Sequence, residues 1–226
     1  YMGAARKYAE WLGGRVVEAV ARAAAGLRPG SIEIAEGKTT FPMCRRLERN
    51  GEIVNAPNPG GPVDNRMRLL LLRGEEGALA AVGMILACHP VATGAQHLLT
   101  ADYPGAWRAE FARAFGPSVM PFFLQGAGGD ARPRHVANPD DWRQLPHDEL
   151  PLLGRDLLNE SLQILSRGRA RTLGSLVLDG RITPVDLPCE QRHTTRQDFQ
   201  ALLAHEDPWT RLYAQNSLTR LDAGQP

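Results

Sequence analysis

The chain has 226 residues, of which 43% are hydrophobic, and its 26 Lys and Arg residues nearly balance its 25 Asp and Glu residues. A chain of this length can bury a substantial core, so we expect a single domain over residues 1–226. The net charge of +1, without long runs of like charge, argues against nucleic acid as a partner. The longest apolar stretch, residues 78–92, is shorter than the roughly 18–20 residues of a membrane span, so we expect no transmembrane segment.

Both ends of the sequence suggest a piece of a longer protein. The chain opens with "YMGAARKY", has no leading methionine and enters a helical pattern at once. The far end, "TRLDAGQP", stops without a closing element. We therefore expect both termini to be internal to a longer chain, and nothing about targeting follows from the sequence.

The three cysteines predict neither a disulfide framework nor a zinc knuckle. Cys44, Cys88 and Cys189 are far apart and odd in number, and no C-x-x-C occurs. We expect buried or inert thiols.

The first part of the chain predicts a helix, a strand and a long loop. Apolar residues recur every four positions from Tyr8 to Val20, which is amphipathic helix spacing up to "GLRPG". Gly13 and Gly14 favour close packing against a neighbour, because each costs about 1 kcal/mol relative to alanine in a helix. "SIEIAEGKT" predicts a strand, and "FPMCRRLERNGEIVNAPNPGGPVDN" predicts an ordered loop because it is rich in Pro, Gly and Asn.

The middle of the chain alternates strands with helices. "RMRLLLLRGEEGALAAVGMILACHP" predicts two strands joined by "GEEG", both apolar enough to be buried on two faces. "TADYPGAWRAEFARAFG" predicts a helix with Thr100 or Asp102 as its cap, and "SVMPFFLQG" predicts the next strand. Asp148 opens another amphipathic helix. The alternation predicts an α/β fold with a layered mixed β-sheet core and flanking helices.

The last part predicts less regular structure. "RTLGSLVLDGRITPVDLP" supplies one or two strands, and "TTRQDFQALLAHEDPWTRLYAQNSLTRL" predicts two short helices broken near Pro208. No internal repeat or low-complexity linker is present.

The loop "FFLQGAGGDARPRH", residues 122–135, raises the question of a nucleotide site. Gly126, Gly128 and Ala131 satisfy a relaxed G-x-G-x-x-[GA] pattern after a predicted strand. A dinucleotide fold needs a helix directly after that pattern, and no helical period begins here before about residue 148. No Gly-Lys-[Ser/Thr] of a Walker A loop occurs either, so the sequence argues against nucleotide binding.

His89 ends an apolar strand at a proline in "VGMILACHP". Polar side chains at the tips of buried strands are well placed to converge on one site, because the sheet fixes their backbones. Taken alone, such a histidine is more often structural than a metal ligand, and no H-E-x-x-H occurs. The residues themselves leave both roles open.

The ordered set of segments resembles the neutral/alkaline ceramidase family, in its N-terminal catalytic domain. The segments are, in chain order, "VVEAVARAAAGLRPGSIEIAEG", "CRRLERNGEI", "PVDNRMRLLLL", "ILACHPVATGAQHLLTADYPGAW" and "FFLQGAGGDARP". The match covers roughly residues 1–140 well and the remainder loosely. The resemblance implies a hydrolase that cleaves the amide between a fatty acid and a sphingoid base. It also implies a catalytic zinc held by two histidines, a glutamate and a tyrosine, of which His89 matches the second histidine.

Other positions carry over by the same resemblance. Arg45 falls where the family has an Asn-Arg motif that faces the active site, so it could bind an anionic group or a developing oxyanion. Asp102 matches a Ser-Asp segment near the metal, although an N-cap role is equally compatible with its position. Gly129 and Asp130 match the family's Gly-Asp turn. We expect Asp130 to be catalytic, Arg45, Asp102 and Gly129 to bind substrate, and His89, Arg45 and Asp130 to surround one cleft.

Two departures from the family pattern bear on activity. The family has a serine two residues after the aspartate, and this chain has Arg132, which cannot be a nucleophile. Either a zinc-bound water attacks the substrate or amidase chemistry has been lost. By the resemblance the first histidine ligand precedes this chain and the glutamate and tyrosine follow it. We therefore expect the other zinc ligands outside this chain, and the fragment alone to be inactive.

The sequence leaves three functions open. The first is a zinc-dependent hydrolase resembling neutral ceramidase, acting on an amide or related bond in a small molecule or lipid. The second is an inactive relative that binds an anionic or lipid-like ligand through Arg45 and Arg132, and the third is an unrelated α/β domain with structural histidines. We hypothesise that Arg132 recognises negative charge near the scissile bond, the alternative being an outward arginine paired with a surface acid.

Overall fold

The computed structural model describes residues 2–96, 98–167, 170–174, 179–186 and 195–224. The chain divides into two compact units, residues 1–176 and 177–226, and each is described by itself. The single domain expected over residues 1–226 stays a prediction. None of the helices in the described ranges is both long and apolar enough to cross a bilayer.

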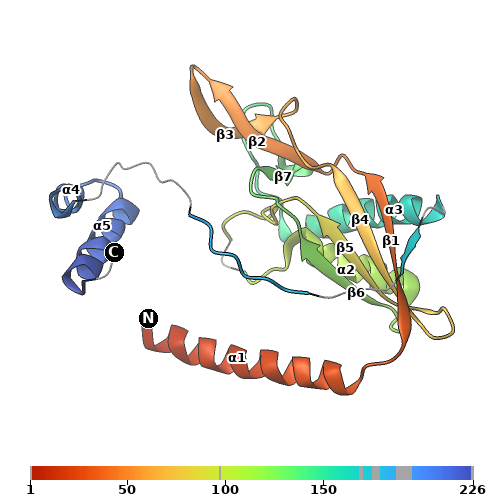
Figure 1. Cartoon of the computed structure of the whole chain (residues 1–226). Helices are drawn as coiled ribbons and strands as arrows, with labels where there is room; N and C mark the ends of the chain where they lie inside the picture. The colour runs from red at the N-terminus through yellow and green to blue at the C-terminus, as the bar shows by residue number, and fades with distance from the viewer. Residues whose placement is uncertain (1, 97, 168–169, 175–178, 187–194, 225–226) are drawn as a thin grey trace. The chain divides into compact units, whose positions relative to one another are not determined.

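A five-stranded mixed sheet forms the centre of the first unit (Figure 1). Its strand order is β6-β5-β4-β1-β8, with all pairs antiparallel except β5 with β6. The strands are β1 (Gly30–Lys38), β4 (Arg66–Gly74), β5 (Leu79–Leu86), β6 (Met120–Gln125) and β8 (Arg171–Leu173). The connection from β5 to the parallel strand β6 passes through a helix, as such crossovers require.

Two helices cover one face of this sheet, α2 (Asp102–Phe115) and α3 (Leu150–Ser166). The period of two in β4 places alternate leucines on that face, where they meet the matching face of β5. These cross-strand pairs are Met67 with Leu86, Leu69 with Met84, and Leu71 with Val82. All six side chains are buried together with Trp107 and Phe111 of α2 and Leu153 and Leu157 of α3.

The opposite face of β4 and β5 is only partly buried. On this face Leu70, Leu72 and Ile85 are half-buried, whereas Ala81 and Gly83 of β5 are buried. The expectation that these strands are buried on two faces therefore holds only in part within the described residues. The helices cover a single face, and alternation sends every second side chain to the other.

The segment expected to be a loop is instead a β-hairpin. β2 (Pro42–Arg49) and β3 (Glu52–Asn58) pair antiparallel, and β7 (Ala131–Pro133) completes a three-stranded sheet in the order β3-β2-β7. Asn50 and Gly51 form the turn with φ angles of 56° and 82°. Positive φ at both central residues is what a tight hairpin needs and what Asn-Gly supplies. The high content of Pro, Gly and Asn outside the turn concealed the strands.

The remaining elements confirm some expectations and correct others. α1 (Met2–Ala25) ends as expected, but a Cβ added at Gly13 or Gly14 would meet no described atom within 4 Å, so no close packing explains these glycines. The helix expected from Asp148 begins at Leu150, after a 3-10 turn at His147–Glu149.

The second unit contains α4 (Arg196–Leu202) and α5 (Pro208–Asp222), the two helices expected around Pro208. Thr195 and Asp198 form a capping box that starts α4, and Asp207 accepts a hydrogen bond from the Thr210 N–H to start α5. Residues 175–178 and 187–188, part of the region expected to hold strands, lie outside the described residues.

We expect the interface between α3 and the sheet to dominate the stability of the first unit. Leu157 is completely buried, whereas Leu152 on the same helix is 49% exposed. Leu157→Ala should lower the free energy of unfolding by about 2–5 kcal/mol through lost transfer energy and a cavity. Leu152→Ala should change it by less than about 0.5 kcal/mol. Urea denaturation followed by tryptophan fluorescence measures both, and equal losses would contradict this packing.

Candidate functional site

His89 lies where the buried part of β5 ends and the chain reaches solvent. Leu86, Ala87 and Cys88 are buried, and His89 and the following proline are exposed. The His89 N–H donates to the Ala131 carbonyl at 2.9 Å, which fixes the histidine backbone against β7. An apolar strand thus delivers an imidazole to the surface in a defined position.

The glycine turn after β6 lies against the same backbone. The Gly126 N–H donates to the Leu86 carbonyl at 3.0 Å. A Cβ at Gly128 would lie 2.7 Å from the Cys88 backbone nitrogen, so only glycine permits this approach. The turn leads into β7 and a 3-10 turn at Arg134–Val136 and not into the helix of a dinucleotide site, as the sequence indicated.

Two cavities meet at His89. The larger, about 810 Å³, has apolar walls formed by Pro90, Val91, Pro104 and Phe123 and also contains Asp102 and Gly129. The smaller, about 300 Å³, is lined by Arg45, Asn55, His89, Val91, Gly94, Ala95 and Arg132. His89, Val91 and Gly94 line both cavities, so the two cavities adjoin at His89.

Asp102 organises the wall of the larger cavity. Its buried carboxylate accepts hydrogen bonds from the Thr93 N–H at 3.1 Å, the Thr93 hydroxyl at 3.2 Å and the Tyr103 N–H at 2.8 Å. Its φ of 50° lies in the left-handed region, which aspartate tolerates better than most residues. Ala101 is the N-cap of α2, and Asp102 is the first helical residue. The carboxylate therefore holds the loop at Thr93.

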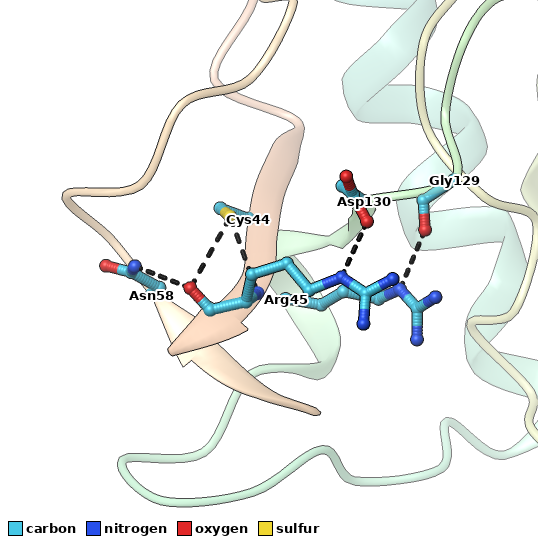
Figure 2. Close-up of polar contacts among 6 residues, drawn as sticks. Cys44, Arg45, Asn58, Gly129 and Asp130 are labelled. Carbon is cyan, nitrogen blue, oxygen red and sulfur yellow. Dashed lines mark hydrogen bonds and ion pairs between the residues drawn. The ribbon is translucent and has the colours of Figure 1, made fainter. Parts of the chain in front are cut away.

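Arg45 reaches the Gly-Asp turn from β2. Its backbone N–H donates to the Asp130 carbonyl at 2.9 Å. Its Nε–H donates to the Gly129 carbonyl at 2.7 Å, as Figure 2 shows. The Asp130 carboxylate pairs instead with Arg46, at 2.7 Å, and lines a separate cavity of about 270 Å³. The structure brings Arg45 and His89 to one cavity and does not place the Asp130 side chain there.

Arg132 projects from β7 into the smaller cavity. Its guanidinium carbon lies 4.9 Å from the centre of the Trp142 ring, and its Nη2 donates to the Val91 carbonyl at 3.4 Å. The Nε is buried and has no hydrogen-bond partner among the described residues. Arg132 is half-buried beside His89, which does not fit an outward arginine paired with a surface acid.

Two buried groups next to His89 are excluded as nucleophiles. Burial raises the pKa of the Cys88 thiol well above its usual range, so the thiol stays protonated. Burial likewise raises the pKa of the Tyr103 hydroxyl, which donates to the Cys88 carbonyl at 2.6 Å. Both groups support the backbone that carries His89.

The described residues do not by themselves form a metal centre. No group of three or more His, Cys, Asp or Glu side chains occurs in the described part of the chain. The carboxylate of Asp102 already accepts three hydrogen bonds, and two guanidinium groups line the smaller cavity. The donor set around His89 therefore does not fit catalytic zinc without ligands from elsewhere.

Sequence reasoning missed three residues that shape the site, namely Asn55, Tyr103 and Trp142. Asn55 was hidden in the segment taken for a loop, and Tyr103 was counted only as part of a helix. Trp142 follows a proline-rich stretch with no periodic pattern. The contact of Trp142 with Arg132, ten positions earlier, arises only in the fold, where the arginine lies over the aromatic face.

Comparison with solved structures identifies the architecture. The structure of neutral ceramidase from Pseudomonas aeruginosa superposes with a TM-score of 0.54 and 19% sequence identity, covering 71% of this chain and 26% of that one. The chain shares its fold with part of neutral ceramidase. A structure of ceramidase complexed with C2 gives a TM-score of 0.52 at 19% identity, covering 68% and 25% of the two chains. This chain thus spans about a quarter of the ceramidase chains it matches.

Sequence comparison does not extend this result, since no protein-family model and no curated protein matches the chain. The resemblance to neutral ceramidase is confirmed as a likeness of fold. The roles of His89, Arg45, Asp102, Gly129 and Asp130 stay predictions.

The approach of the glycine turn to Cys88 can be tested with neighbouring glycines. Gly128→Ala should lower the free energy of unfolding by about 1–3 kcal/mol, because its Cβ collides with backbone that cannot rotate away. Gly129→Ala should change it by less than about 0.5 kcal/mol, since a Cβ there meets nothing within 4 Å. Thermal unfolding of both variants decides the matter, and a tolerated Gly128→Ala would refute the close contact.

The protected state of Cys88 gives a chemical prediction. Because burial raises its pKa, the thiol should resist iodoacetamide at pH 8 to about the same degree as at pH 7. Mass spectrometry of tryptic peptides should find Cys88 modified only after the protein is unfolded in denaturant. Rapid labelling of the folded protein would mean that the β5 tip opens to solvent.

Proposed function

We propose that the chain is part of a ceramidase-like hydrolase domain, and that the two cavities at His89 form its substrate site. The reaction is cleavage of an amide (N-acyl) or related bond in a small molecule or lipid. The observation that carries this proposal is the position of His89 at the junction of an apolar and a cationic cavity. The fold shared with neutral ceramidase supports it.

The cavities suit an acyl substrate in size and lining. A volume of about 810 Å³ lies within the range of small-molecule sites, and its walls of proline, valine and phenylalanine favour a hydrocarbon chain. The scissile bond then lies near His89. Arg45, held by the Gly129 carbonyl, has a guanidinium in the same region that stabilises negative charge developing on a carbonyl oxygen.

We propose that the full-length protein binds zinc and that His89 supplies one of the ligands. His89 is the one candidate ligand that the resemblance assigns to this chain, and an imidazole is a common zinc ligand. When bound, zinc would supply Lewis-acid activation of the amide carbonyl or of a water. The donor set of the described residues does not fit zinc alone, so we propose that the remaining ligands lie outside this chain, as the resemblance implies.

A second candidate function is ligand binding without turnover. The observation that favours it is Arg132, which occupies the position matched to the family's serine and lines the smaller cavity. A guanidinium can bind and orient a substrate but cannot attack it. Under this alternative the same cavities hold a ligand that leaves unchanged.

Substitution of His89 in the full-length protein tests the hydrolase. His89→Ala should lower kcat/KM for an N-acyl sphingoid base or a simpler N-acyl amide by at least about 100-fold. The zinc content measured by atomic emission should fall in the same variant. The fold should persist, because His89 is exposed at a strand tip.

His205→Ala is the matched control, since His205 is an exposed histidine in the second unit. It should retain both turnover and zinc. Wild-type protein that binds zinc but cleaves no N-acyl compound would favour the binding function, and unchanged zinc in His89→Ala would refute the ligand assignment.

A further inference from the structure

The smaller cavity contains two arginines that form no ion pair with any residue that the structure describes. Arg45 and Arg132 both line it, together with Asn55 and His89. Within the described residues neither guanidinium forms an ion pair, whereas the adjacent Arg46 is paired with Asp130 at 2.7 Å. Arginines that face one another in a partly buried cavity normally have a carboxylate or phosphate between or beside them.

Both guanidinium groups are held in place by contacts that leave donors free. Arg45 uses its Nε–H on the Gly129 carbonyl, and Arg132 donates one Nη2 hydrogen bond to the Val91 carbonyl while its plane lies near the Trp142 ring. Each guanidinium has five N–H donors. The described contacts therefore orient the two groups without satisfying them, which is the arrangement of a preorganised binding site.

The electrostatics of the cavity favour an anion. The pKa of Arg132 is lowered, chiefly by burial and next by the charge of Arg45, while Asp141 and Asp102 act in the opposite direction. A lowered pKa means that the charged form is held at a cost in free energy. A bound anion would remove that cost, because it would lie near both positive groups.

The larger cavity indicates what the anion is attached to. His89, Val91 and Gly94 line both cavities, so the two cavities adjoin at these residues. The larger space has apolar walls at Pro104 and Phe123. A single molecule with an anionic end and an apolar chain would fill both.

We infer that Arg45 and Arg132 form an oxyanion subsite, and that the ligand of this chain is an amphiphile whose carboxylate or phosphate binds there while its hydrocarbon part occupies the larger cavity. The inference rests on the proposed function in taking the His89 cavities as the ligand site, and it requires no turnover. It also explains why Arg132 stands at the position matched to the family's serine. An arginine there binds the negative charge of the ligand, whereas a serine would act as a nucleophile.

Binding of three probes of equal chain length to the full-length protein tests the inference. Octanoate, octyl phosphate and octanol are titrated by isothermal calorimetry below their aggregation limits. We expect at least one of the two anions to bind at least about tenfold more tightly than octanol. The tighter of the two anions identifies a carboxylate or a phosphate as the natural group. Equal affinity for octanol and both anions, or no anion binding at millimolar concentration, would overturn the inference.

Single substitutions locate the subsite. Arg132→Gln and Arg45→Gln should each reduce the preference for the anion by at least about tenfold and leave octanol binding unchanged. Arg46→Gln is the matched control, because it removes the same charge from the next residue, whose side chain pairs with Asp130 outside the cavity. A loss in Arg46→Gln equal to that in the two variants would show a general field effect and overturn the site.

Folding and turnover are separated from binding. Thermal unfolding checks each variant, and Arg132→Lys serves if Arg132→Gln does not fold, since lysine keeps the charge but loses the planar fork. It should retain only part of the anion preference. Anion binding without hydrolysis of N-acyl compounds would support the subsite and reject the hydrolase proposal. Hydrolysis without a preference for the anions would support the hydrolase proposal and reject the subsite.

Discussion

The site depends on one backbone contact, between the end of β5 and the glycine turn that follows β6. Gly128 allows the turn to touch the Cys88 backbone, and the His89 N–H binds the Ala131 carbonyl at 2.9 Å. This contact joins the five-stranded sheet to β7. Since β7 pairs with β2, it also brings Arg45 to a histidine 44 positions away in the sequence. Without this contact, the end of β5, the β7 segment and β2 would not be held together around the cavity.

Elements with a strong local hydrophobic pattern could be predicted from the sequence. Features that depend on pairing with another strand or on coverage by another layer could not. The apolar run of β4 and the four-residue spacing of Trp107, Phe111 and Phe115 in α2 lead directly to the observed strand and helix. The Pro-, Gly- and Asn-rich composition around β2 and β3 favours a loop, whereas the Asn50–Gly51 pair is a strong local signal of the tight turn that joins them. Burial on two faces was overestimated because a run of leucines does not reveal how many layers cover it.

Part of the site could be predicted from the sequence. The rest could not, because it depends on strand pairing and not on local sequence patterns. His89 and the glycine turn are local features, so strand ends and glycines pointed to them. The cavity shared by Arg45 and Arg132 arises from pairing between β2 and β7, which no local pattern encodes. The resemblance to ceramidases supplied the correct fold because it used the order of several segments. It also predicts a catalytic role for Asp130, which stays a prediction; the Asp130 carboxylate is paired with Arg46.

The backbone of Asp102 has a consequence for how this position is compared among relatives. Its φ of 50° suits only glycine, asparagine and aspartate well, and of these only the last two can accept the hydrogen bonds from Thr93. A position limited in this way keeps its residue type for conformational reasons alone. An aspartate or asparagine at the position of Asp102 in distant sequences would therefore reflect the backbone geometry of the loop. It would be no evidence about which ligand the cavity binds.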